Sequence, residues 1–130
     1  MRHFVDTNIV VYAFSNGSKA DRAAEVLAGA TISVQVLNEY ANVALRKLKY
    51  DSAKLTKRIA SIRKQVKITV PIDEASHDLA RNITFRYQLS FYDSVLIASA
   101  LLADCDIFYS EDMQHGLNVE DRLTIINPFV

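Results

Sequence analysis

The most apolar segment of the chain, YDSVLIASALLA, spans Tyr92–Ala103. Its hydrophobic residues lie on every side of a helix rather than along one stripe, a pattern typical of a helix buried in a core. At twelve residues it is too short to cross a bilayer, so no membrane span is expected. We therefore expect this segment to form a central core helix, around which the other elements pack.

Short apolar runs alternate with segments of helical periodicity along the chain. The predicted strands are His3–Val5, Thr31–Val34, Val66–Val70, Asp106–Tyr109 and Leu123–Ile126. The predicted helices are Ile9–Phe14, Lys19–Leu27, Val36–Leu48, Ser52–Lys64, Asp73–Tyr87 and Tyr92–Ala103. Strands that alternate with helices imply right-handed crossovers and a parallel sheet with helices on both faces. The expected fold class is α/β, a three-layer α/β/α sandwich with a mostly parallel central sheet.

The size and composition indicate one globular domain over residues 1–130. Half of the residues are hydrophobic, and glycine and proline together number only five, which excludes a disordered or collagenous chain. The single cysteine, Cys105, cannot close a disulfide within the chain, and the N-terminus lacks the pattern of a secretory signal. A cytoplasmic location is expected.

The formal net charge of zero conceals three segregated blocks. Residues 1–45 carry three basic and four acidic side chains, residues 46–67 carry nine basic and one acidic, and residues 68–130 carry three basic and ten acidic. The basic block is either a surface for phosphates or an acidic partner, or an ordinary solvated helix face. The balanced total therefore argues only against a uniformly basic nucleic-acid-binding surface.

Four acidic residues lie after predicted strands or near the starts of predicted helices. They are Asp6, Glu39, Asp93 and Asp112. In a parallel sheet these strand ends and the following helix starts share one edge, where ligands bind. Each acidic residue also has an ordinary interpretation, such as a helix cap for Asp6, a favourable helix dipole for Asp93 or an Asx turn for Asp112.

Four carboxylates at one edge would repel one another unless a cation joined them. Oxygen ligands favour Mg²⁺ or Mn²⁺, whereas one cysteine and three scattered histidines disfavour zinc. A metal held by carboxylates is suited to hydrolysis of phosphodiester bonds. The residues themselves therefore indicate a magnesium- or manganese-dependent hydrolase.

Four short motifs carry a resemblance to a known family. They are Val5-Asp6-Thr7-Asn8, Leu37-Asn38-Glu39-Tyr40, the segment from Ser90 to Ala98, and Tyr109-Ser110-Glu111-Asp112-Met113. In this order and spacing the chain resembles the PIN-domain ribonucleases, and most of all the VapC-type toxins of bacterial and archaeal toxin–antitoxin pairs. The sequence departs from many relatives at Ser110, where they carry threonine.

The resemblance implies a PIN-like fold and an endoribonuclease that cleaves RNA with Mg²⁺ or Mn²⁺. It implies that Asp6, Glu39, Asp93 and Asp112 are the catalytic, metal-binding residues, and it leaves Glu111 as an alternative to Asp112. Thr7, Asn8 and Ser110 would support them through hydrogen bonds. It further implies a toxin that forms a homodimer and is silenced by a cognate antitoxin protein.

Other classes of protein remain open at this stage. A PIN-domain nuclease that processes RNA without a toxin role, or an inactive relative acting as a protein-interaction module, would share these motifs. A receiver-like signalling domain would also have an acidic pocket, with Asp73 near its phospho-accepting position, although its usual lysine is missing from Leu123–Ile126. A haloacid-dehalogenase-like phosphatase would need a second aspartate at the position of Asn8. Five aromatic residues fit either base stacking or, more commonly, core packing: Tyr50, Phe85, Tyr87, Phe91 and Tyr92.

Overall fold

The computed structural model describes residues 1–130 and contains one six-stranded sheet. The strands are β1 (His3–Val5), β2 (Thr31–Ser33), β3 (Ile68–Val70), β4 (Ile107–Tyr109), β5 (Asn118–Val119) and β6 (Leu123–Ile126), in the order β3-β2-β1-β4-β6-β5. All neighbouring pairs are parallel except β5 with β6. The carboxyl ends of the five parallel strands therefore lie at one edge of the sheet.

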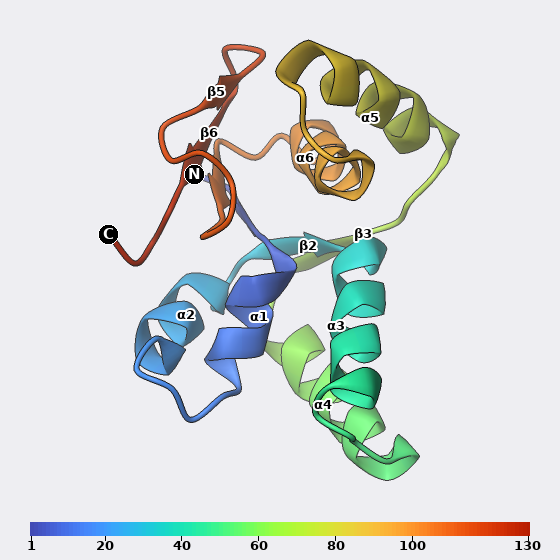
Figure 1. Cartoon of the computed structure of the whole chain (residues 1–130), viewed down its shortest axis with the longest axis vertical. Helices are drawn as coiled ribbons and strands as arrows, with labels where there is room; N and C mark the ends of the chain where they lie inside the picture. The colour runs from blue at the N-terminus through green and yellow to red at the C-terminus, as the bar shows by residue number, and fades with distance from the viewer.

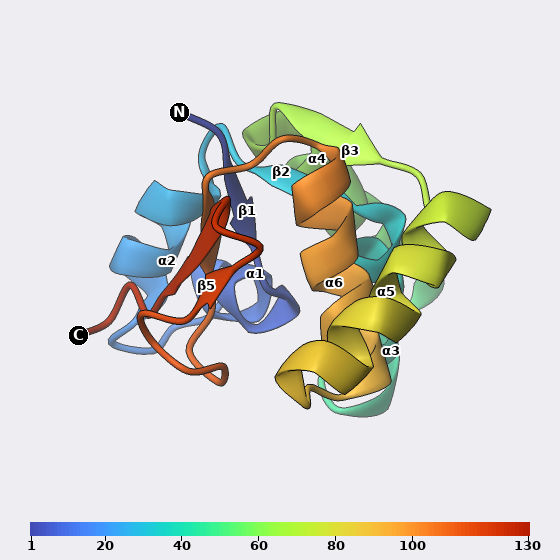
Figure 2. The ribbon, with the colours of Figure 1, turned by 90° about the horizontal axis from the view of Figure 1, so that it is seen from above.

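Six helices surround the sheet. They are α1 (Thr7–Ala13), α2 (Ala20–Leu27), α3 (Val34–Arg46), α4 (Ser52–Gln65), α5 (Glu74–Tyr87) and α6 (Phe91–Leu102). Helices α1 and α2 pack together on one side of the sheet, while α5 and α6 pack together on the other (Figures 1 and 2). Helices α3 and α4 pack against each other and extend beyond the sheet in Figure 1. The expected α/β fold with a mostly parallel sheet is confirmed.

Helix α6 occupies the interior, as its composition predicted. Its residues Ser94 to Leu101 are all buried, and this uninterrupted burial explains why apolar residues occur on every side of the helix. Ser94 and Ser99 satisfy their buried hydroxyls by donating to the carbonyl oxygens of Ser90 and Val95, one turn earlier. These two serines of α6 are thus accommodated in the core without leaving their hydroxyls unpaired.

The predicted elements differ from the observed ones mainly at their ends. Strand β3 begins at Ile68 rather than Val66, and α3 begins at Val34 rather than Val36. The two-residue strand β5 was not predicted, because its single ladder against β6 leaves no hydrophobic alternation to detect. No helix is both long and apolar enough to span a membrane.

Candidate active site

The strand pairing brings the four predicted carboxylates to the same edge of the sheet. Asp6 follows β1 directly, and Asp112 lies three residues beyond β4, which pairs with β1. Glu39 lies in α3, which begins directly after β2, and Asp93 lies in the first turn of α6. The tertiary structure therefore joins residues from four separate parts of the chain.

Asp6 is the most buried of these acids, with 7% of its surface exposed. It is the N-cap of α1, accepting a hydrogen bond of 2.7 Å from the Thr7 backbone N–H, and its other oxygen accepts one of 2.8 Å from Ser110 Oγ. Burial nevertheless raises the pKa of Asp6 from 3.8 to about 6, and the nearby charges of Asp93 and Glu39 add to this increase. Asp6 thus caps α1, as predicted, and also belongs to the acidic cluster.

Glu39 is held by two polar side chains. Thr7 Oγ1 donates a hydrogen bond of 2.5 Å to one carboxylate oxygen, and Gln35 Nε2 donates one of 3.3 Å to the other. Thr7 follows β1 and Gln35 lies one turn earlier in α3, so both ends of the Glu39 carboxylate are fixed in direction. The hydrogen bond from Thr7 to Glu39 is the kind of contact that the predicted supporting role of Thr7 requires.

Asp93 lies at the start of the buried helix α6. Ser90 is the N-cap of this helix, and its hydroxyl accepts a hydrogen bond of 3.2 Å from the Asp93 backbone N–H. Burial raises the pKa of Asp93, and the charges of Glu39 and Asp112 raise it further, whereas a hydrogen bond between the Ser90 hydroxyl and the Asp93 side chain lowers it. Each of the four acids therefore lies within electrostatic reach of at least one other.

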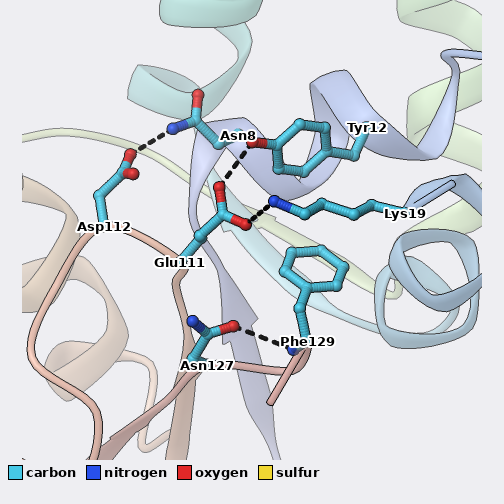
Figure 3. A network of polar contacts seen from close by, with 7 residues as sticks. All are labelled: Asn8, Tyr12, Lys19, Glu111, Asp112, Asn127 and Phe129. Carbon is cyan, nitrogen blue, oxygen red and sulfur yellow. Dashed lines mark hydrogen bonds and ion pairs between the residues drawn. The ribbon is translucent and has the colours of Figure 1, made fainter. Parts of the chain in front are cut away.

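The adjacent residues Glu111 and Asp112 point to different partners (Figure 3). Asp112 accepts a hydrogen bond from Asn8 Nδ2, whereas Glu111 forms an ion pair with Lys19 and accepts a hydrogen bond of 2.6 Å from the Tyr12 hydroxyl. These two partners lower the pKa of Glu111. Glu111 is thus already neutralised by Lys19, while Asp112 contributes its charge to the acidic cluster.

Two more residues of Figure 3 support the Lys19–Glu111 pair. The Lys19 ammonium lies 5.0 Å from the ring centroid of Tyr12 and 5.3 Å from that of Phe129, positions favourable for cation–π attraction. Asn127 Oδ1 accepts a hydrogen bond from the Phe129 backbone N–H, a local bond within the C-terminal segment. The C-terminal segment therefore contributes an aromatic ring beside Lys19.

The side chains do not close into one ligand cage, since no three His, Cys, Asp or Glu side chains are arranged to hold a metal ion. Asp6, Glu39 and Asp112 are held instead by separate side-chain hydrogen bonds. The donor set nevertheless fits Mg²⁺ or Mn²⁺, because it contains only carboxylate oxygens. The raised pKa of Asp6 also fits a cation site, since a cation would favour the ionised form that burial and neighbouring charges disfavour.

The structure excludes the receiver-like interpretation. In the doubly wound order of receiver folds, the strand before the phospho-accepting residue lies beside the first strand. Here β3 is an edge strand separated from β1 by β2. Asp73 instead is the N-cap of α5, where it forms a capping box with Ser76. Asp73 therefore lies apart from the candidate site.

The PIN domain sequence profile matches residues 3–116, which contain all four acidic motifs. The chain belongs to the PIN-domain family. The family resemblance predicted from those motifs is thereby confirmed. No curated protein sequence matches the chain at a significant level.

Solved structures show that the PIN fold extends over nearly the whole chain. A toxin–antitoxin complex from Klebsiella pneumoniae matches with a TM-score of 0.73 and 18% identity, covering 98% of each chain. VapC20 from Mycobacterium tuberculosis, described as a toxin that cleaves the sarcin–ricin loop, matches with a TM-score of 0.66 and 18% identity, over 85% of this chain and 89% of that one. VapBC2 from Rickettsia felis, bound to promoter DNA, matches with a TM-score of 0.69 and 14% identity, over 98% of this chain and 100% of that one. At these identities the likeness concerns the fold.

Three residues of this PIN domain's site were not predicted from the sequence. Gln35 contacts Glu39 within α3, whereas Tyr12 and Lys19 contact Glu111 only because the loop after β4 meets α1 and the start of α2. Gln35 stands four residues before Glu39, a spacing that places two side chains on one helix face and would have given a signal. Nothing in the sequence near Tyr12 or Lys19 indicates Glu111 as their partner.

Proposed function

We propose that this PIN-domain protein is a divalent-metal-dependent endoribonuclease that hydrolyses RNA phosphodiester bonds. Asp6, Glu39, Asp93 and Asp112 would hold Mg²⁺ or Mn²⁺ as its catalytic residues. The observation that carries the proposal is the electrostatic cluster at the carboxyl edge of the sheet, where burial and neighbouring acids raise the pKa of both Asp6 and Asp93. Such a cluster destabilises the metal-free protein, which is a cost expected where a cation is needed for function.

The chain's own residues would act by orienting these acids. Ser110 fixes Asp6, Thr7 fixes Glu39 and Asn8 fixes Asp112, each through a direct side-chain hydrogen bond. Bound divalent cations supply Lewis-acid stabilisation of phosphate charge and lower the pKa of water. Glu111, paired with Lys19, would serve to position the loop rather than to bind metal.

Cleavage assays on the recombinant chain test this function. We expect cleavage of single-stranded RNA with Mg²⁺ or Mn²⁺ and none with EDTA, and we expect Asp6→Asn and Asp93→Asn to lower the rate at least about a hundredfold. The exposed Asp21 on α2 provides the matched control, and Asp21→Asn should cleave like the parent. Equal cleavage by the parent, Asp6→Asn and Asp93→Asn, with matched folding, would show that the assignment is wrong.

We further propose that the protein is the toxin of a toxin–antitoxin pair, acts in the cytoplasm and forms a homodimer. Support comes from the family resemblance and from similarly folded chains that are described as parts of toxin–antitoxin complexes. Expression of the chain alone should arrest growth, and co-expression of the small open reading frame expected beside its gene should restore growth. Light scattering of the purified chain measures the dimer. An active enzyme that is harmless on expression would instead be an RNA-processing PIN nuclease.

A further inference from the structure

A hollow of about 310 Å³ lies directly beside the candidate site. Its walls are Gln35, Asn38, Glu39 and Asn42 from α3 and Tyr92 from α6. Glu39 belongs to both the hollow and the acidic cluster. A molecule bound in the hollow would therefore lie next to a phosphate bound at the acidic cluster.

The arrangement of the wall follows from the pattern of α3. Residues 35, 38, 39 and 42 are spaced three or four apart and so lie on one face of the helix. The core-facing side of the same helix carries Val36, Leu37, Tyr40 and Ala44, all buried. The carboxamides of Asn38 and Asn42 consequently face outward, and both residues are exposed.

Tyr92 provides an exposed aromatic surface opposite these carboxamides. It is 62% exposed, although it lies in a helix whose next turns are buried in the core. The fold therefore gains little from this ring, which differs from the more common expectation that aromatic residues in this part of the sequence pack in the core. A ring of this kind beside an acidic cluster is available for stacking.

The chemistry of the hollow matches a nucleobase better than a phosphate. Carboxamides both donate and accept hydrogen bonds, as the edges of unpaired bases require, and aromatic side chains stack on bases. The wall contains no cationic side chain and includes the carboxylate of Glu39, which would repel a phosphate. Asn42 also borders a second hollow of about 270 Å³ with Val43, Arg46 and Lys47. The positive charges there are placed to contact the phosphates of the neighbouring nucleotides of an RNA chain.

We propose that this hollow binds one unpaired nucleobase of the RNA, next to the bond that is cleaved. Tyr92 stacks on the base, while Asn38 and Asn42 read its edge and set a nucleotide preference at that position. The inference rests on the proposed ribonuclease function and adds to it a specificity-determining subsite. The supporting geometry comes entirely from α3 and the first turn of α6.

A random-sequence single-stranded RNA pool, with the cut ends sequenced, tests the subsite. Tyr92→Ala and Asn42→Ala should reduce the nucleotide preference at one position beside the cut and lower kcat/KM for the preferred sequence about tenfold. Tyr92→Phe keeps the ring and should keep the preference. The matched controls are Phe85→Ala and Asn82→Ala on α5, both exposed and away from the hollow, which should leave the profile unchanged.

Two outcomes separate the subsite from the ribonuclease function. If the parent cleaves RNA with Mg²⁺ but Tyr92→Ala and Asn42→Ala retain its sequence profile, the subsite is refuted and the ribonuclease function stands. If the parent does not cleave RNA, the ribonuclease function fails, and binding of fluorescein-labelled single-stranded RNA in Ca²⁺, followed by anisotropy, tests the hollow separately. Equal binding by the parent, Tyr92→Ala and Phe85→Ala would refute it, whereas a tenfold loss confined to Tyr92→Ala would support a base-binding site.

Discussion

Replacing Asp6 by asparagine should stabilise the metal-free protein at neutral pH. Asp6 is 7% exposed, and its pKa rises from 3.8 to about 6 on folding, mainly because of burial. A difference of this size corresponds to about 3 kcal/mol of folding free energy that the ionised group costs. Asparagine keeps an acceptor for the Thr7 backbone N–H, but it loses the charge-assisted bond from Ser110, which offsets about 1 kcal/mol. The net expected gain is about 2 kcal/mol.

The gain must depend on pH in one direction. Below about pH 4 Asp6 is protonated in both the folded and the unfolded chain, so its full contribution to stability is present. Between pH 4 and 6 the folded chain retains a proton that the unfolded chain loses, and the stability contributed by Asp6 falls as pH rises. Above pH 6 the whole cost applies to the parent and none to the variant. The difference between the two proteins should therefore open from about pH 4 to pH 6.

Urea denaturation followed by circular dichroism, in EDTA at pH 4 and pH 7.5, measures this difference. The variant should be more stable than the parent by about 2 kcal/mol at pH 7.5 and no more stable than the parent at pH 4. The exposed Asp21 again provides the control, since Asp21→Asn should not reproduce the pH dependence. Adding Mn²⁺ should stabilise the parent more than the Asp6→Asn protein. A stability difference that is the same at both pH values, or a variant less stable than the parent at pH 7.5, would contradict a raised pKa of Asp6 in the folded chain.

Three further substitutions test other parts of the structure by the same denaturation assay. Ser33→Ala should leave stability unchanged or raise it by about 1 kcal/mol, because the Ser33 hydroxyl is buried without a partner and makes no capping bond. A loss of stability above about 1 kcal/mol would show that the hydroxyl has a partner in the folded protein. Tyr12→Phe should lower stability by about 1 kcal/mol through loss of its bond to Glu111, and an unchanged midpoint would show that this bond contributes nothing. Ile97→Ala should cost about 3 kcal/mol, because Ile97 is fully buried in α6, and a cost under 1 kcal/mol would contradict the central packing of that helix.

Much of the fold could be predicted because periodicity is a local property of the sequence. Helix α6 is apolar on all sides, and α3 repeats its apolar residues at helical spacing, so both were identified near their observed bounds. Strand ends were less certain, since only hydrogen-bonded pairing defines where a short strand begins. β3 starts at Ile68 because its ladder with β2 begins there.

The sequence likewise predicts the acids of the candidate site but not their hydrogen-bond partners. The sequence alone determined that Asp6, Glu39, Asp93 and Asp112 follow strand ends or helix starts, and a parallel sheet brings such positions to one edge. Which neighbour holds each acid depends on contacts between segments about 30 to 100 residues apart, as between Thr7 and Glu39 or Asn8 and Asp112. No local pattern encodes those partners.

The surroundings of two residues depend on the tertiary structure. The sequence indicates Asp112 and leaves Glu111 as an alternative, and in the structure Lys19 and Tyr12 engage Glu111, because α1, the start of α2 and the loop after β4 meet at one place. Tyr92 has the spacing of a core residue, yet the packing of α6 against α3 leaves it exposed beside Glu39. The sequence by itself thus determined which acids follow strands or begin helices, because periodicity and the order of the elements along the chain are read locally. Only the packing of distant helices decided which acid is neutralised and which aromatic ring is exposed.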